Sequence, residues 1–190
     1  MGKVVRVILC FVLISCVLTG CAVFNAKPVL NYSMVNPSQS ARNITVCVSE
    51  VEDVRANKSG LIGEIYNGYG IKTGEIREPD NVIQWVTKAM KEELTNAGYN
   101  VTDTDEAQLK IKSEIINISA SYGYAFHGTV VLRICCIKGN DRIFEKLYTG
   151  SSEKLELLQP SLSKGVANVL ERSLQEVMKQ LILDMNKVAG

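Results

Sequence analysis

PSLSKGVANVLERSLQEVMKQLILDMNK, residues 160–187, is the stretch with the clearest periodicity in this chain. Its apolar side chains recur every three or four positions, and because an α-helix turns once in ~3.6 residues, they share one face of a helix. These residues are Leu162, Val166, Val169, Leu170, Leu174, Val177, Leu181 and Met185. The stretch therefore predicts a long amphipathic helix, which requires an apolar surface to pack against.

Five segments upstream of this helix have the short length and mostly alternating apolar pattern of β-strands. They are residues 44–51, 99–102, 109–118, 129–138 and 142–149. Within 109–118 the apolar face changes parity after Ile115, which predicts a β-bulge near that residue. We expect the last three segments to form a meander.

A second helix is predicted over residues 83–97, where apolar residues recur at helical spacing. We expect Asp80 to cap its N-terminus and Gly98 to end it. Upstream, Asn67-Gly68 predicts a β-hairpin with a two-residue type I′ turn, in which both residues need positive φ.

These elements predict a single α+β domain over residues 44–190. We expect an antiparallel or mixed β-sheet of about five strands, with two amphipathic helices packed on one face. The other face of the sheet is expected to be wet or covered by a partner.

The N-terminal residues have the layout of a secretory signal peptide. Lys3 and Arg6 form a basic region, and Val7 to Leu18 form an apolar one. Twelve residues in a helix span ~18 Å, which is too short for a hydrocarbon core of about 30 Å. We therefore interpret residues 1–20 as a signal peptide and not as a membrane-spanning helix.

A cysteine follows the apolar region in the pattern read by a bacterial lipoprotein signal peptidase. This lipobox consists of Leu18, Thr19, Gly20 and Cys21. Acylation of the Cys21 thiol, with palmitate among the chains, would attach the mature protein to a membrane; two or more chains give stable attachment. Ala22 favours sorting to the outer membrane, on the leaflet that faces the periplasm.

Residues 21–43 carry the lipid anchor and are predicted to form an extended tether. Pro28, Pro37 and several Asn and Ser residues interrupt any helical or alternating period in this segment. We expect the tether to let the domain stand away from the membrane.

Composition excludes several classes of function. The formal net charge is +1, and it becomes −1 when Lys3 and Arg6 leave with the signal peptide, so no nucleic acid partner is expected.

The glycine spacing around Gly68 to Gly74 matches no nucleotide-binding loop. The single histidine, His127, has no partners at a spacing suited to catalysis or metal binding. We expect no catalytic residues, no metal and no cofactor.

Three cysteines remain in the mature domain besides Cys21. Parity puts Cys136 toward the core and Cys135 on the opposite face of its strand. If the strands of Cys47 and Cys135 are neighbours, these two residues could form a disulfide, which requires Cα atoms within ~7 Å. The alternative is that Cys47, Cys135 and Cys136 are all reduced and buried.

The layout resembles the YajG family of bacterial lipoproteins over nearly the whole mature chain. The matching features are the lipobox cysteine, Asp53-Val-Arg55 after the first strand, the turn Asn67-Gly68-Tyr69-Gly70, the helix end Glu93-Leu94-Thr-Asn-Ala-Gly98-Tyr99-Asn-Val101, and Leu109-Lys-Ile111. The resemblance implies an envelope lipoprotein of unassigned biochemical role, and it supplies no active site.

We therefore expect a non-catalytic binding or assembly module, anchored by its lipid and facing the periplasm, with an envelope protein as partner. Tyrosines in turns are the candidate contact residues, namely Tyr66, Tyr69, Tyr122 and Tyr124. The alternatives are an accessory subunit of an envelope transport or secretion complex and, less favoured, an envelope hydrolase.

Overall fold

The computed structural model describes residues 24–35, 38–155 and 161–189. These residues contain two helices and eight strands of one mixed sheet, which confirms the α+β class and corrects the predicted five strands. The elements are β1 (Phe24–Ala26), β2 (Thr45–Asp53), β3 (Leu61–Tyr66), β4 (Lys72–Arg77), α2 (Val82–Asn96), β5 (Asn100–Thr102), β6 (Leu109–Tyr122), β7 (Phe126–Lys138), β8 (Asp141–Lys154) and α3 (Leu162–Ala189).

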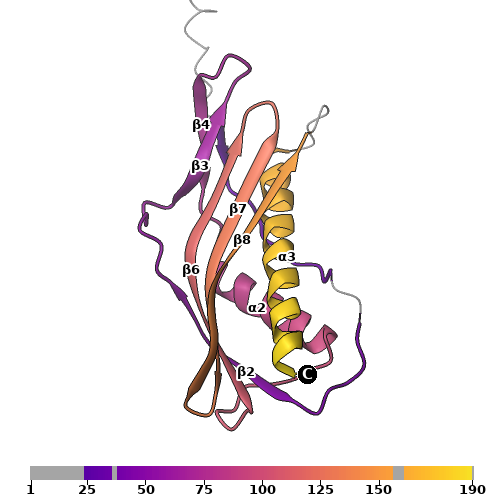
Figure 1. The fold of residues 1–190 in the computed structure, drawn as a ribbon. Coiled ribbons are helices and arrows are strands. Elements are labelled where there is room, and N and C mark those ends of the chain that lie inside the picture. Colours follow the sequence, from indigo (N-terminus) through magenta and orange to yellow (C-terminus); the bar gives the residue numbers. More distant parts are fainter. Residues whose placement is uncertain (1–23, 36–37, 156–160, 190) are drawn as a thin grey trace, which may run out of the picture.

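Strand β6 lies at the centre of the sheet (Figure 1). One of its edges pairs along its length with β7, and β7 pairs in turn with β8, so the predicted antiparallel meander is confirmed. The other edge is shared by two strands: β2 runs parallel to residues 109–115, and β3 runs parallel to residues 120–122. The sheet therefore divides at β6 into a β2–β5 branch and a β3–β4–β1 branch.

The three strands beyond the predicted five all belong to one branch: the sequence predicted the hairpin between β3 and β4 but not its place in the sheet, and it did not predict β1. β3 (LIGEIY) is interrupted by Gly63 and Glu64, and β4 (KTGEIR) is mostly polar around Gly74, so neither has the continuous apolar face on which the strand predictions relied. Both glycines are required by close packing: a Cβ at Gly63 would lie 1.6 Å from the carbonyl oxygen of Ala120, and one at Gly74 would lie 1.9 Å from that of Phe24. The strands form because their backbones pair with neighbours distant in sequence.

Both helices pack on the same side of the sheet and share one core with it, as predicted. α3 lies along β7 and β8, and α2 contacts β2, β5 and α3 (Figure 1). The predicted apolar stripe of the terminal helix is buried from Val166 to Met185. Neither helix is long and apolar enough to cross a membrane.

Two local predictions about the strands are confirmed, apart from the type of one turn. The β-bulge is confirmed, because the β6–β7 register shifts between Ile115 and Asn117. The β3–β4 hairpin is also confirmed, but its type I′ turn is wrong. The turn is longer than two residues, positive φ occurs at Gly70, and the side chain of Asn67 accepts hydrogen bonds from the backbone N–H groups of Tyr69 and Ile71.

Of the two predicted ends of α2, the C-terminal end is confirmed and the N-terminal cap is wrong. Gly98 has a positive φ of 86° just beyond the helix, and the N–H of Tyr99 donates to the carbonyl of Leu94, which confirms the predicted end. Asp80 does not cap the helix. The N-cap is Asn81, and the Asp80 carboxylate instead pairs with the ammonium of Lys27 at 2.8 Å.

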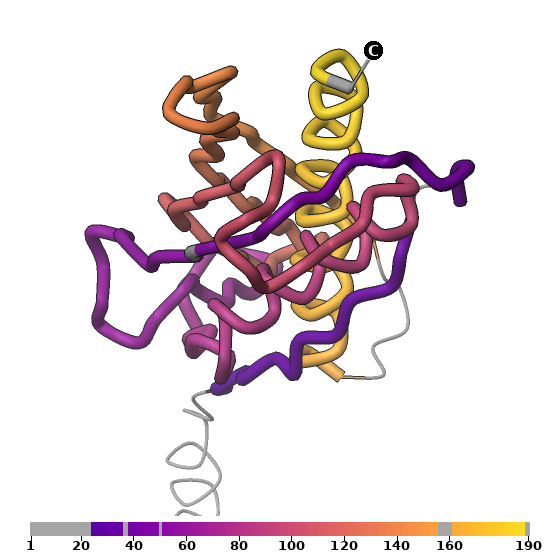
Figure 2. The backbone as a smooth tube through the Cα atoms, turned by 90° about the horizontal axis from the view of Figure 1, so that it is seen from below, coloured from indigo at the N-terminus to yellow at the C-terminus, as the bar shows by residue number. Residues whose placement is uncertain are grey.

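Residues 24–35 lie against the domain, which corrects this part of the predicted tether. β1 pairs in parallel with β4, and Ala26 and Tyr32 are buried. The indole N–H of Trp85 donates to the carbonyl of Asn31, and Gln175 of α3 donates to that of Ser33. Figure 2 shows this segment following the outside of the helical layer. The prolines interrupt secondary structure here without preventing tertiary packing.

Candidate functional site

The lipobox residues Leu18 to Cys21 lie outside the described residues, so their predicted role stays a prediction. The four tyrosines predicted as contacts are all described, and the structure brings them to one end of the sheet. Tyr66 and Tyr69 lie at the tip of the β3–β4 hairpin, and Tyr122 and Tyr124 lie at the β6–β7 turn. We call the tips of these two hairpins, residues 65–71 and 122–126, the tyrosine end.

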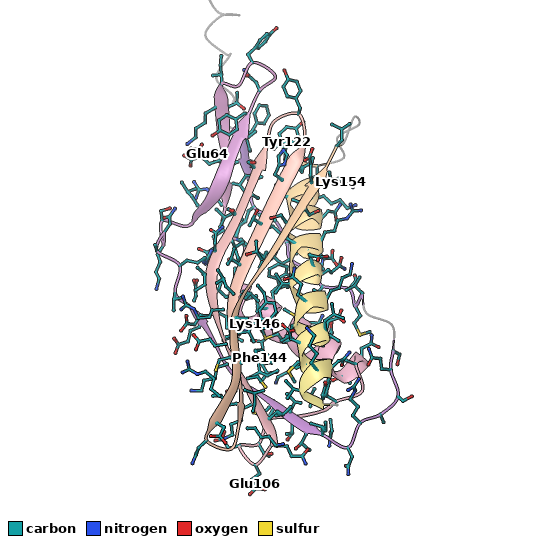
Figure 3. All side chains as sticks on the ribbon, viewed as in Figure 1. Glu64, Glu106, Tyr122, Phe144, Lys146 and Lys154 are labelled. Atoms are coloured by element: carbon teal, nitrogen blue, oxygen red, sulfur yellow. The ribbon has the colours of Figure 1, made fainter. Side chains whose placement is uncertain are left out.

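One side-chain hydrogen bond and the strand pairing of Ile65 with Tyr122 hold the two tips together. The hydroxyl of Tyr124 donates to the carbonyl oxygen of Gly68, which joins the β6–β7 turn to the β3–β4 hairpin. The ring of Tyr122 packs on that of Phe126, with centroids 4.4 Å apart. Figure 3 labels Tyr122 at this end of the molecule and Glu106 at the opposite end. The tyrosine end is therefore a single joined surface rather than two independent loops.

The four tyrosines differ in how much of each side chain is available to a partner. Tyr69 is 91% exposed and Tyr124 is 77% exposed. Tyr66 is half-buried, and its hydroxyl donates to the carboxylate of Glu64. Lys72, 2.8 Å from Glu64, and the Tyr66 hydroxyl together lower the pKa of the Glu64 carboxyl. Tyr69 and Tyr124 are thus the two tyrosines with most surface to offer.

A second candidate surface lies on the open face of the sheet, which neither helix covers. Arg133 pairs there with Glu114 on β6, and its Nε lies 4.0 Å from Glu145 on β8, which also pairs with Arg142. These charges line a cavity of about 370 Å³ together with Glu52, Lys112, Ser113, Cys135 and Ile137. Charges of both signs alternate across the face, so it has no single-sign field that would select a nucleic acid.

A third feature is the point at which the sheet divides. Arg55 is buried there, and its guanidinium makes two hydrogen bonds to Asp53, of 2.6 and 2.9 Å, and pairs with Glu78. The hydrogen bond from Arg55 lowers the pKa of the Asp53 carboxyl. A cavity of about 450 Å³ lies beside this cluster. The motif Asp53-Val-Arg55 does not reveal this pairing by itself, because Glu78 is distant in the chain.

Of the two alternatives for the cysteines, the structure agrees with the reduced one, except that Cys135 is only half-buried. Cys47, Cys135 and Cys136 are all free. Cys47 lies opposite Lys110 on β6 and Cys135 lies opposite Lys112, so β6 separates their strands. Two strand spacings amount to ~9.5 Å, which exceeds the reach of a disulfide. Cys136 is buried in the core, as parity predicted.

The single histidine lies in an exposed pair. His127 Nδ1 is 3.7 Å from the carboxylate of Glu153 on the neighbouring strand, and both side chains are more than half exposed. Among the residues that the structure describes, no three His, Cys, Asp or Glu side chains gather in an arrangement that could hold a metal ion.

The fold, the tyrosine end and the open face place this chain in one class of protein. It is a small α+β domain whose sheet is covered by helices on one side and open on the other. The chain belongs to a family of uncharacterized lipoproteins, because the model of that family matches residues 33–186. Membership of this family agrees with the prediction that the chain is a lipoprotein. It also indicates an envelope-associated protein. No curated protein matches the chain in sequence.

Solved structures with the same general fold include protein XCC0632 from Xanthomonas campestris. It matches with a TM-score of 0.55 and 13% identity, over 84% of this chain and 92% of that one. Protein CT253 from Chlamydia trachomatis matches with a TM-score of 0.48 and 12% identity, over 76% and 96%. Lipoprotein GNA1162 from Neisseria meningitidis matches with a TM-score of 0.38 and 9% identity, over 77% and 98%. At these identities the likeness to XCC0632 shows a shared fold alone.

Proposed function

We propose that this chain is a lipid-anchored envelope lipoprotein of the YajG type that acts as a non-catalytic binding or assembly module. Acylation of Cys21 would fix it to the outer membrane, on the leaflet facing the periplasm. The observation that carries the proposal is the lipobox at Leu18 to Cys21 in a chain of a lipoprotein family. The domain would then present its surfaces to a partner protein in the same compartment.

The arrangement of the domain supports a binding role. The two helices α2 and α3 cover one face of the sheet. On the open face, Leu147 and Ile143 are exposed beside the charged cavity that Arg133 and Glu145 line. A face that mixes apolar and paired charged side chains suits a protein partner, since such interfaces combine an apolar centre with a polar rim.

Acylation is tested by expressing the full chain with a radiolabelled fatty acid in a Gram-negative host. We expect label in the wild type and none in Cys21→Ser, with the label recovered in the outer membrane fraction after density separation. Cys135→Ser is the matched control, because it removes a half-buried thiol far from the lipobox. Label that persists in Cys21→Ser would contradict the proposal.

Partner binding is tested with photo-crosslinking side chains at Leu147 on the open face and at Tyr66 and Tyr124, in intact cells. A discrete crosslinked protein at one of these positions, absent when the crosslinker is at Glu106, would support the binding role. Only non-specific products at all three positions would contradict it.

A second function is favoured by one observation. β8 pairs only with β7 among the described strands, so alternate residues along its other edge offer backbone groups for strand addition, apart from any that α3 already contacts, as Gln180 contacts the Thr149 carbonyl. This edge suits an accessory subunit of an envelope transport or secretion complex. Solubilised complexes that run far above the monomer mass, and that revert to monomer when β8 carries Leu147→Pro, would favour this function.

A further inference from the structure

The tyrosine end has a composition unlike the opposite end of the sheet. Residues 65–71 read IYNGYGI and residues 122–126 read YGYAF, without a charged side chain. The opposite end holds DTDE at 103–106 and KGNDR at 138–142. The two tips can therefore leave water without a charge of their own losing its hydration, whereas the other end cannot. The charges that flank the tips are Glu64 and Lys72, which pair with each other, and Lys154, which lies opposite Phe126 on β8.

Apolar side chains at the tyrosine end point into solvent. Besides Tyr69 and Tyr124, Ile71 is 60% exposed at the hairpin tip, and Phe24 is 52% exposed on the adjoining strand β1. Phe24 pairs with Gly74, on the strand that leads away from this tip. Exposed tyrosines beside exposed aliphatic and aromatic residues are typical of side chains at a membrane–water interface, where an apolar ring carries a polar group.

The position of Phe24 connects this end to the anchor. Cys21 precedes Phe24 by three residues, and three residues span at most ~10 Å when fully extended. An acyl chain on Cys21 lies in the bilayer, so Phe24 must lie within about that distance of the membrane surface, and the β3–β4 hairpin lies beside Phe24. Because residues 24–35 pack on the domain, they cannot act as a long tether; a free segment through residue 43 would have allowed the domain to stand far from the lipid.

We infer that the tyrosine end docks on the lipid bilayer that carries the anchor, with Phe24, Tyr69, Ile71 and Tyr124 in the headgroup region. This inference rests on the acylation of Cys21 under Proposed function. The hydrogen bond from Tyr124 to Gly68 presents both hairpin tips to the membrane as one surface. The sheet then extends away from the bilayer, and its open face and charged end remain accessible to a partner (Figure 1).

Tryptophan fluorescence tests the docking in the full acylated protein. The chain is purified from membranes, its acyl mass is verified, and it is reconstituted into vesicles of phosphatidylethanolamine and phosphatidylglycerol with brominated acyl chains. Tryptophan is introduced as Tyr69→Trp or Tyr124→Trp, and as Glu106→Trp for the matched control at the opposite end. Native Trp85 is buried, so it contributes a constant background that the parent protein measures.

Docking predicts that bromine attached near the headgroup quenches the added fluorescence in Tyr69→Trp and shifts its emission to the blue, with no quenching in Glu106→Trp. Tyr69 has an exposed side chain, so this variant tests docking without disturbing the fold. Acylated protein in which neither Tyr69→Trp nor Tyr124→Trp is quenched, or in which all three variants are quenched equally, would overturn the docking and leave the anchor intact.

Two further outcomes separate the proposals. Absence of acyl mass on Cys21 would overturn the proposed anchor, and the docking with it. A crosslinker at Tyr69 that traps one discrete protein in cells, in place of lipid, would assign the tyrosine end to a protein partner and overturn its docking on the bilayer.

Discussion

The hydroxyl of Tyr32 donates a hydrogen bond of 2.8 Å to the carboxylate of Glu93, 61 positions further along the chain. Glu93 lies fully buried on α2, and the same carboxylate oxygen accepts from the N–H of Val35 at 2.8 Å. A buried carboxylate requires such donors because it has lost its hydration. This contact fastens the N-terminal segment to the helical layer, and therefore fixes where the chain that follows the lipobox joins the domain.

Tyr32→Phe should reduce the free energy of unfolding by about 1–3 kcal/mol, because it removes one donor from a buried charged acceptor. Burial of Tyr32, together with its bond to Glu93, raises the pKa of the phenol, so the wild-type donor keeps its proton over the working range of pH. Urea unfolding of the two proteins measures the difference. Tyr69→Phe is the matched control, with an exposed side chain, and should change stability by no more than about 0.5 kcal/mol. Equal effects of the two substitutions would contradict the role of this bond.

Gly150→Ala should destabilise the packing of α3 on the sheet. A Cβ at Gly150 would lie 1.9 Å from the carbonyl oxygen of Ser173, so the helix must move away from β8. We expect a loss of about 1–3 kcal/mol, the usual cost of overpacking a core. Gly123→Ala is the control, since a Cβ there meets no atom within 4 Å. Thermal unfolding of both variants tests this, and a Gly150→Ala protein as stable as Gly123→Ala would refute the close approach.

Asp184 should make stability depend on pH in the acid range. Burial alone would raise the pKa of its carboxyl, but hydrogen bonds from Lys146, Lys187 and Tyr148 outweigh burial and lower the pKa to about 2. Because the folded pKa lies below the unfolded value of ~3.9, the contribution of Asp184 is complete above about pH 4 and is lost as pH falls toward 2. Asp184→Asn should therefore be less stable than wild type at pH 7, and the difference should shrink below pH 4.

The measurement for Asp184 is urea unfolding of wild type and Asp184→Asn at a series of pH values from 7 to 2. Glu176→Gln serves as the control on the same helix, because its pairing with Lys179 is exposed and 3.9 Å long. A difference between wild type and Asp184→Asn that stays constant with pH would show that the ionised carboxylate contributes nothing.

The three domain cysteines should remain reduced after export. Non-reducing mass spectrometry of the mature protein should show three free thiols, since β6 separates Cys47 from Cys135. Under native conditions a maleimide should modify half-buried Cys135 before Cys136, whose burial raises its pKa to about 11 and so lowers its thiolate fraction. A peptide crosslinked between Cys47 and Cys135 would contradict the strand order.

Sequence periodicity was enough to predict the elements whose amphipathic face is continuous. α3, the β6–β7–β8 meander and its bulge follow from apolar residues at spacings of 3.6 and 2, because each element forms by burying that face. The lipobox is also a prediction from local sequence, since a peptidase would recognise it as a short linear motif. What these patterns leave open is which strands lie beside one another.

The remaining features depend on contacts between residues distant in sequence. β1, β3 and β4 exist because their backbones bond to strands distant in sequence, and Glu93 and Arg55 acquire their partners only when Tyr32 and Glu78 are brought to them. The same folding gathers Tyr69 and Tyr124 at one end, near Phe24. The sequence by itself determined which faces must be buried and where a lipid would be attached, because both are local. Only the tertiary structure decided which end of the domain lies beside Phe24, the first described residue after the lipobox, because hydrogen bonding between strands acts across any separation in the chain.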